Sequence, residues 1–189
     1  MTNSTNFSGA RRLAAATLGV TVLALSGASH AQDRPQPSPQ ARVMTGYELY
    51  VVYRDRSWQW PDGAGRMETE GRRFTAVAGS GDAASWADGR WIVTDRGRLC
   101  LDADWHAAAG TFADRTCFEH LIDGRTIYQR RAPAGDWYVF KNYPTEADDE
   151  FTKLVREDLV SVELEELRSA SRSQRLSSAS SFSGVNDNE

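Results

Sequence analysis

The chain has 189 residues, of which 40% are hydrophobic, 22 are basic and 26 are acidic, giving a formal net charge of −4. Nucleic-acid-binding proteins show a clear basic excess or a basic stripe, so this composition argues against a nucleic-acid partner. The length, less the polar segments at both ends, is enough for one modest hydrophobic core.

The chain begins with a predicted signal peptide over residues 1–31. Arg11 and Arg12 form a charged region, and an apolar run over residues 13–25 is too short to span a bilayer. Small residues at 29 and 31 are those that a signal peptidase reads. We expect a periplasmic or secreted protein with no stable membrane insertion after cleavage. An uncleaved anchor is the alternative.

A Pro-rich linker is predicted over residues 32–42, where three prolines in a polar frame favour a semi-extended spacer. The next segment has a helix signature, because Thr45 and Glu48 have the spacing of a capping box. We therefore expect a short N-terminal helix, although the apolar run that follows also fits a strand.

Residues 43–143 are predicted to form an all-β domain. Short segments rich in β-branched and aromatic residues alternate with Gly-containing dipeptides that are typical of hairpin turns. We count eight or nine short strands, which favours an antiparallel meander closed into a small barrel or folded as a sandwich. The turn dipeptides are Asp62-Gly63, Glu70-Gly71, Asp88-Gly89, Arg96-Gly97, Asp123-Gly124 and Ala134-Gly135.

A C-terminal helix is predicted over residues 144–170, with Thr145 as its cap. Its expected apolar stripe consists of Phe151, Leu154, Val155, Leu159 and Val162. We expect this helix to pack on its own domain in a monomer; docking to a partner or a second copy is the alternative. Residues 171–189 are rich in Ser and low in hydrophobic residues, which predicts a disordered tail.

The only two cysteines, Cys100 and Cys117, fall in consecutive predicted strands. Two cysteines in an exported protein usually pair, so we predict a disulfide between them. The alternative is a metal site that adds His106 and His120, but the spacing matches no established zinc pattern. Alternation also places His120 on the face opposite Cys117.

Three carboxylates, Asp102, Asp104 and Glu119, are predicted to share one face near the cysteines, with Arg115 beside them. This face is a candidate ligand face, and paired carboxylates perform acid–base chemistry when one of them is buried. A solvated face with compensating charges is the simpler interpretation. The sequence predicts no catalytic residue, no cofactor site and no metal site.

All six tryptophans fall in the predicted β domain, at positions 58, 60, 86, 91, 105 and 137. Most are expected in the core, because a small β domain needs large side chains to bury enough area, and one or two could line a pocket for an apolar or sugar ligand.

A pattern of Trp, Cys and Gly positions extends over about residues 45–141: Trp58-x-Trp60-x-Asp62-Gly63, Gly89-Arg90-Trp91, Leu99-Cys100, Trp105, Cys117-Phe118, Asp123-Gly124, Tyr128 and Gly135-Asp136-Trp137-Tyr138. The order and spacing of these positions resemble the small exported bacterial family called domain of unknown function 995. The resemblance implies an exported, periplasmic β domain, and it brings no catalytic residues and no ligand. The residues beyond Tyr143 look like an extension outside the shared part.

Two functions remain open from the sequence. The first is a non-enzymatic binding or interaction module for a small molecule, a glycan or an envelope protein, one version being an inhibitor of a wall-degrading enzyme. The second is a hydrolase that uses Asp102, Asp104 and Glu119. A carboxylate buried in a cleft would favour the hydrolase, whereas a cavity inside the barrel would favour the binding module.

Overall fold

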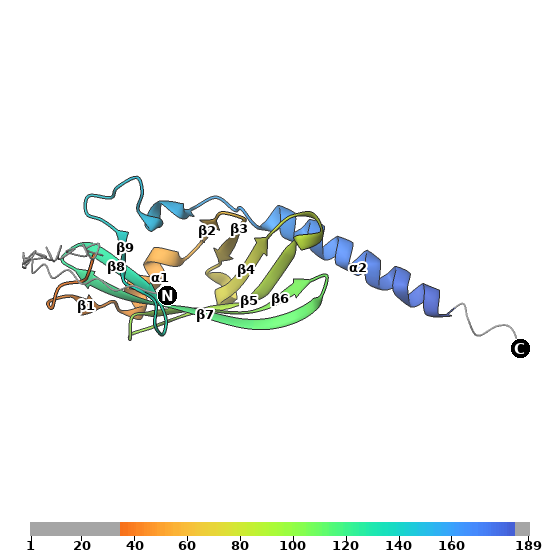
Figure 1. Ribbon diagram of the computed structural model, residues 1–189, viewed down its shortest axis with the longest axis horizontal. Helices are drawn as coiled ribbons and strands as arrows, with labels where there is room; N and C mark the ends of the chain where they lie inside the picture. The colour runs from red at the N-terminus through yellow and green to blue at the C-terminus, as the bar shows by residue number, and fades with distance from the viewer. Residues whose placement is uncertain (1–34, 184–189) are drawn as a thin grey trace, which may run out of the picture. The chain divides into compact units, whose positions relative to one another are not determined.

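The computed structural model describes residues 35–183 (Figure 1). The predicted signal peptide, the start of the linker and the end of the Ser-rich tail lie outside these residues. Within the described part of the chain, no helix is both long enough and apolar enough to cross a membrane.

One antiparallel sheet makes up most of the fold, and this confirms the predicted fold class. Its strands follow one another in the order β10-β2-β3-β4-β5-β6-β7-β8-β9, and β1 pairs with the end of β7 beyond the part that pairs with β6. The strands are β1 (Arg42–Val43), β2 (Arg56–Trp60), β3 (Gly63–Met67), β4 (Arg73–Ala78), β5 (Ser85–Thr94), β6 (Arg98–Ala107), β7 (Gly110–Asp123), β8 (Thr126–Arg131), β9 (Tyr138–Lys141) and β10 (Leu154–Val155).

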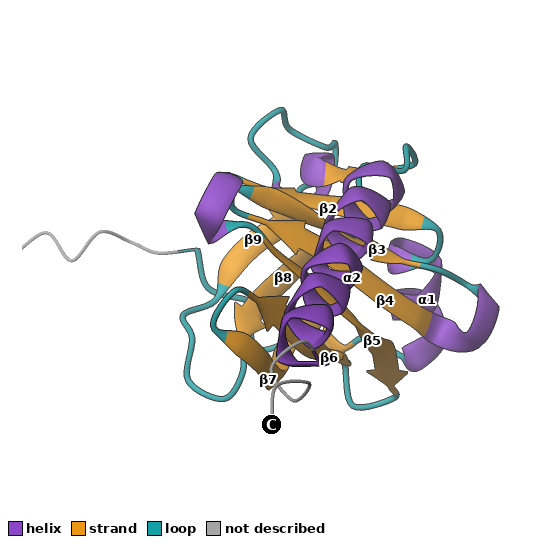
Figure 2. Cartoon of the chain, turned by 90° about the vertical axis from the view of Figure 1, so that its right-hand side faces the viewer, coloured by secondary structure: helices purple, strands orange, loops and turns teal. Residues whose placement is uncertain are grey.

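The sheet curls into a half-barrel, and its two ends do not pair with each other (Figure 2). The small barrel, one of the two expected arrangements, is therefore not closed by strand pairing. A short 3₁₀ helix, η3 (Glu150–Lys153), contacts both ends instead. The ring of Phe151 lies 6.0 Å from that of Phe140 in β9, and the Arg56 guanidinium of β2 lies 5.5 Å from the Phe151 ring. The Phe151 side chain thus packs between the two ends of the sheet, which no hydrogen-bonded strand pair connects.

Helix α1 (Gly46–Tyr53) begins at the predicted capping box. The Glu48 amide donates to Thr45 Oγ1 at 3.2 Å, and the Thr45 amide donates to Glu48 Oε2 at 2.8 Å. Hydrogen bonds from Arg42 and the Thr45 backbone lower the pKa of Glu48 to about 2. The capped helix, and not the alternative strand, thereby buries Leu49 and Tyr53 in the core.

The C-terminal part of the predicted linker is not a free spacer. The amide of Ser38 donates to Asp123 Oδ2 at 3.1 Å, at the end of β7. Arg42 and Val43 then form β1, one residue earlier than the expected start of the domain. The segment is fixed because β7 extends past its last pair with β6, Glu119 with Arg98, and leaves a backbone edge with which β1 pairs.

The predicted helix over residues 144–170 is wrong in its first half. The Asp149 carboxylate is buried and accepts hydrogen bonds from the Asn142 amide, the Asn142 side chain and the Glu146 amide, at 2.8 to 2.9 Å. These bonds hold residues 142–149 as a loop. Phe151 then belongs to η3, and Leu154 of β10 pairs with Trp58 of β2. Phe151 and Leu154 have the spacing of one helical face, but each packs against the core from a different element.

Helix α2 (Ser161–Ser183) begins after Asp158, whose carboxylate accepts from the amides of Val160 and Ser161 at 3.0 Å. It crosses the outer face of β4 and β5 (Figure 2). The helix continues through Ser183, so the tail predicted to be disordered from residue 171 is helical over its described part. The apolar residues in this contact are Ala64, Val77, Trp86, Val160, Leu164 and Leu167.

The packing of α2 against β4 and β5 can be tested with two substitutions in the same helix. Leu164 is 3% exposed beneath the helix, whereas Val162 is 76% exposed although it belonged to the predicted stripe. Leu164→Ala should lower the free energy of unfolding by about 2 kcal/mol, because it removes buried apolar area and leaves a cavity. Val162→Ala should change it by less than about 0.5 kcal/mol. Urea unfolding of both variants measures the difference, and equal effects would show that α2 does not pack as described.

Candidate functional site

The inner face of the half-barrel encloses a cavity of about 530 Å³. This volume falls within the range of about 300–1,000 Å³ that is typical of small-molecule sites. Its walls come from η3 and from six of the ten strands, which are β2, β4, β6, β7, β8 and β9. The lining residues are Trp58, Gln59, Trp60, Phe74, Leu101, Ala103, Trp105, Asp114, Thr116, Phe118, Arg131, Tyr138 and Glu150.

Six of the thirteen lining residues are aromatic, because alternation along the strands directs every second side chain to the inner face. Phe118 of β7 lies 5.1 Å from Trp58 of β2 between ring centroids, so residues from opposite sides of the half-barrel meet across it. Gly65 of β3 makes room for these rings, since a Cβ there would lie 2.7 Å from the Phe74 ring and 3.0 Å from the Trp60 ring. The predicted pocket-lining role of one or two tryptophans thus falls to Trp58, Trp60 and Trp105.

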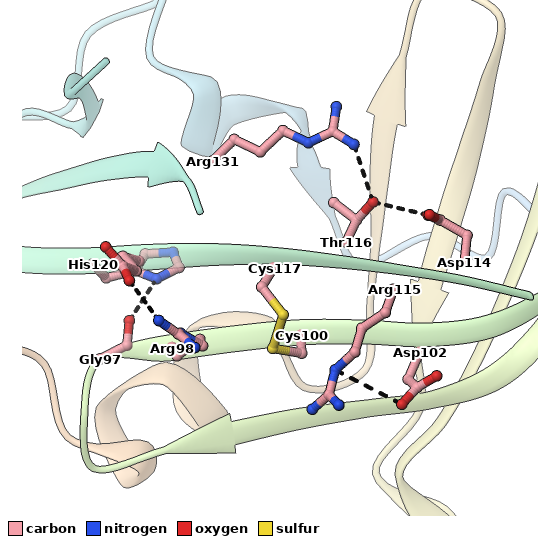
Figure 3. Close-up of a disulfide and its surroundings, with 11 residues drawn as sticks. Gly97, Arg98, Cys100, Asp102, Asp114, Arg115, Thr116, Cys117, His120 and Arg131 are labelled. Carbon is pink, nitrogen blue, oxygen red and sulfur yellow. Dashed lines mark hydrogen bonds and ion pairs between the residues drawn. A yellow bond between two sulfur atoms is a disulfide. The ribbon is translucent and has the colours of Figure 1, made fainter. Parts of the chain in front are cut away.

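A chain of three polar side chains lies along one wall of the cavity (Figure 3). Arg131 Nη2 donates to Thr116 Oγ1 at 3.3 Å, and the Thr116 hydroxyl donates to Asp114 Oδ2 at 2.9 Å. Arg131 and Asp114 are exposed, whereas Thr116 is half-buried. The cavity therefore has a positive and a negative group at its solvent-facing side, joined by one hydroxyl.

Glu150 of η3 is the other carboxylate of the cavity. Its Oε1 accepts from the Trp58 indole at 2.9 Å, and its Oε2 accepts from Lys153 at 2.6 Å. The first bond fixes the plane of the Trp58 ring, and the second offsets the negative charge. The role of Glu150 here is to hold an aromatic wall in position.

A buried chain of hydrogen bonds runs from the cavity into the core. The Tyr138 hydroxyl donates to Gln129 Oε1, Gln129 Nε2 donates to the Tyr53 hydroxyl at 2.7 Å, and Tyr53 donates to His120 Nε2 at 2.7 Å. His120 Nδ1 in turn donates to the carbonyl of Gly97 at 3.2 Å. This order requires neutral His120 with its proton on Nδ1.

Burial is the main cause of the pKa shifts in this chain. It lowers the pKa of His120 to about 4, and it raises the pKa of both the Tyr53 and the Tyr138 hydroxyls. All the groups are therefore neutral near pH 7, and the chain fixes the Tyr138 ring in the cavity wall. The sequence analysis missed this chain, because 67 residues separate Tyr53 from His120 and no local pattern joins them.

The predicted ligand face lies on the other side of the sheet from the cavity. Asp102 and Arg115 are exposed there and lie 3.8 Å apart (Figure 3). Glu119 accepts from Arg98 at 2.7 Å and also pairs with Arg130, and hydrogen bonds from these two arginines lower its pKa. Asp104 is exposed. The structure brings the four predicted residues to one face, but it does not place a carboxylate in a cleft there.

The residues of the alternative metal site do not gather. His106 stacks on Trp86 with ring centroids 3.8 Å apart, on the outer face, whereas His120 is buried on the inner face. Over residues 35–183, no group of three or more His, Cys, Asp or Glu side chains is arranged to hold a metal ion.

Cys100 and Cys117 occupy directly opposed positions of β6 and β7, with Cα atoms 4.1 Å apart and their sulfur atoms at bonding distance (Figure 3). We expect the protein isolated from cells under non-reducing conditions to have the mass of the chain less two hydrogens. Peptide mapping should show one linked pair of peptides that separates on reduction. Alkylation of both thiols without prior reduction would contradict the pairing.

These features define a class of protein: a single-sheet antiparallel half-barrel with an aromatic cavity on its inner face and a cysteine pair on its outer face. The chain belongs to the family described as protein of unknown function (DUF995), whose profile matches residues 20–160. The match extends beyond Tyr143 and includes η3 and β10, contrary to our expectation, so that only α2 and the tail follow it. No curated protein and no solved structure matches the chain significantly.

Proposed function

We propose that this protein is an exported, non-enzymatic binding module that holds a small molecule with an apolar body on the inner face of its half-barrel. The observation that carries the proposal is the cavity of about 530 Å³ lined by aromatic side chains. Sites for small molecules are concave and mostly apolar, with a few polar groups that fix orientation. Arg131, Thr116 and Asp114 supply such groups.

The alternative of a hydrolase has less support. Asp102 and Asp104 are exposed on the outer face, and Glu119 is engaged by two arginines. Catalytic carboxylates usually lie in a cleft that holds the substrate, and none of these three lines the cavity. Binding therefore accounts better for the arrangement of side chains than acid–base chemistry does.

A neutral fluorescent probe tests the binding site directly. N-phenyl-1-naphthylamine fluoresces more strongly in apolar surroundings, and we expect it to bind the wild-type protein. Thr116→Trp should weaken this binding at least about tenfold, because the indole would occupy the cavity that a ligand needs. The matched control is Ala113→Trp, which adds the same side chain on the outer face of the same strand, where Ala113 is exposed.

Melting curves of both variants check that the folded state is retained. Unchanged probe affinity in a folded Thr116→Trp variant would contradict the proposed site, as would the absence of probe binding to the wild-type protein.

The proposed export rests on the sequence of residues 1–31 and on the cysteine pair, which suits an oxidising compartment. We expect the mature chain to begin near Gln32 and to fractionate with the periplasm or the medium. Cell fractionation followed by N-terminal sequencing measures this. A cytoplasmic pool that retains Met1 would contradict it.

A further inference from the structure

We infer that the natural ligand of the cavity is an amphipathic organic anion, whose acidic group binds Arg131 while its apolar body lies against the aromatic wall. The inference rests on the proposed function, since it names the ligand class of the same cavity. It follows from how Arg131 differs from the other arginines of the neighbouring strands.

The arginines on the outer face of these strands are already matched by carboxylates. Arg98 and Arg130 both pair with Glu119, and Arg115 lies 3.8 Å from Asp102. Arg131 is adjacent in sequence to Arg130 but points to the inner face, where it lines the cavity. In the described part of the chain, its side chain makes one hydrogen bond, to Thr116, and no ion pair.

A guanidinium group has five N–H donors in a fixed planar fork, which suits a carboxylate, sulfonate or phosphate with two oxygens. Thr116 uses one of these donors and holds the group beside the cavity. The remaining donors are available where the aromatic wall meets solvent. A ligand with an apolar body and an acidic end would satisfy both surfaces at once.

Two carboxylates also line the cavity, and their charges affect how strongly it favours an anion over a neutral ligand. Glu150 is compensated by Lys153 at 2.6 Å and by the Trp58 indole. Asp114 is linked to Arg131 only through the Thr116 hydroxyl, so its charge opposes an anion at the same site. Neutralising Asp114 should therefore strengthen anion binding, whereas neutralising Arg131 should remove the preference for anions.

Two probes with the same aromatic body separate the acidic group from the apolar one. 1-Anilinonaphthalene-8-sulfonate is N-phenyl-1-naphthylamine with an added sulfonate. We expect the wild-type protein to bind the sulfonate about tenfold more tightly than the neutral probe, as a charge-assisted hydrogen bond allows. Arg131→Gln should abolish this difference, by weakening the binding of the sulfonate much more than that of the neutral probe.

Further variants test the geometry. Asp114→Asn should raise the affinity for the sulfonate severalfold relative to that for the neutral probe. Arg131→Lys keeps the charge but loses the planar fork, so it should retain part of the preference. Arg115→Gln, on the outer face, is the matched control and should leave both affinities unchanged.

The outcomes distinguish this inference from the proposed function. If the neutral probe binds and Thr116→Trp blocks its binding, but the sulfonate binds no more tightly than the neutral probe, the binding function stands and the anionic ligand class is overturned. A preference for the sulfonate that survives Arg131→Gln overturns it as well, and so does tighter binding of a cationic naphthalene derivative. If the neutral probe does not bind the wild-type protein, the proposed function itself fails.

Discussion

Replacing Gly89 by alanine is expected to lower the free energy of unfolding by about 3 kcal/mol or more, although it adds a single methyl group. The added Cβ would lie 2.1 Å from the carbonyl oxygen of Asp102 and 2.5 Å from the Cα of Ala103. These atoms belong to the backbone of β6, which is paired with β5 on both sides of the contact. The sheet can relieve the clash only by opening where it curls around the cavity.

The matched control is Gly124→Ala in the turn between β7 and β8. Gly124 has a φ of +59°, and a Cβ there would meet no atom within 4 Å. Its replacement should cost about 1 kcal/mol, from backbone conformation alone. Urea unfolding of both variants measures the two effects. A Gly89→Ala protein as stable as Gly124→Ala would show that β5 and β6 do not approach as closely as described.

Acidification is expected to destabilise the protein through His120 before most carboxylates titrate. Burial lowers the pKa of His120 from 6.5 to about 4 in the folded state, so the unfolded chain takes up a proton first as the pH falls. The stability is complete above pH 6.5 and falls between pH 6.5 and 4. The loss over this window should be on the order of 3 kcal/mol, because each pKa unit corresponds to about 1.4 kcal/mol.

The physical reason is burial, because a charged imidazolium in the core would lose the water that hydrates it in the unfolded chain. Urea unfolding between pH 7.5 and pH 5 measures the slope. His120→Gln should remove most of it. His106→Gln should retain it, because His106 lies outside the buried hydrogen-bond chain. A wild-type stability that stays constant over this range would contradict the assignment.

Much of the sheet could be predicted because alternation is a local property of each strand. The opposed faces of Cys117 and His120 follow from alternation alone. The shared face of Asp102 and Glu119 also requires the register of β6 with β7, which pairing of Cys100 with Cys117 sets. The capping box of Thr45 was equally local, since both of its hydrogen bonds lie within four residues.

The sequence predictions were wrong where one local pattern is compatible with two different structures. Asp88-Gly89 has the residues of a hairpin turn but lies inside β5, where glycine is needed for close approach to β6. Phe151 and Leu154 have helical spacing but belong to η3 and β10. In each case the deciding contact is with a distant strand, which no local pattern specifies.

The candidate site was only partly predictable for the same reason. Alternation indicated which aromatic side chains share a face, but the curl of the sheet decides which of them meet across the half-barrel. Trp58 and Phe118 are 60 residues apart and lie 5.1 Å from each other between ring centroids. The pairing of Thr116 with Arg131 likewise depends on the register of β7 with β8.

The six tryptophans provide the most direct test of the inner face as a ligand site. Trp58, Trp60 and Trp105 line the cavity, whereas Trp86, Trp91 and Trp137 do not. In a ¹H–¹⁵N spectrum the indole signals can be assigned by single Trp→Phe replacements and then followed during titration with N-phenyl-1-naphthylamine. We predict that the signals of the three cavity tryptophans shift and that those of the other three stay in place. Shifts confined to Trp86, Trp91 or Trp137, or no shifts at all, would contradict a binding site inside the half-barrel.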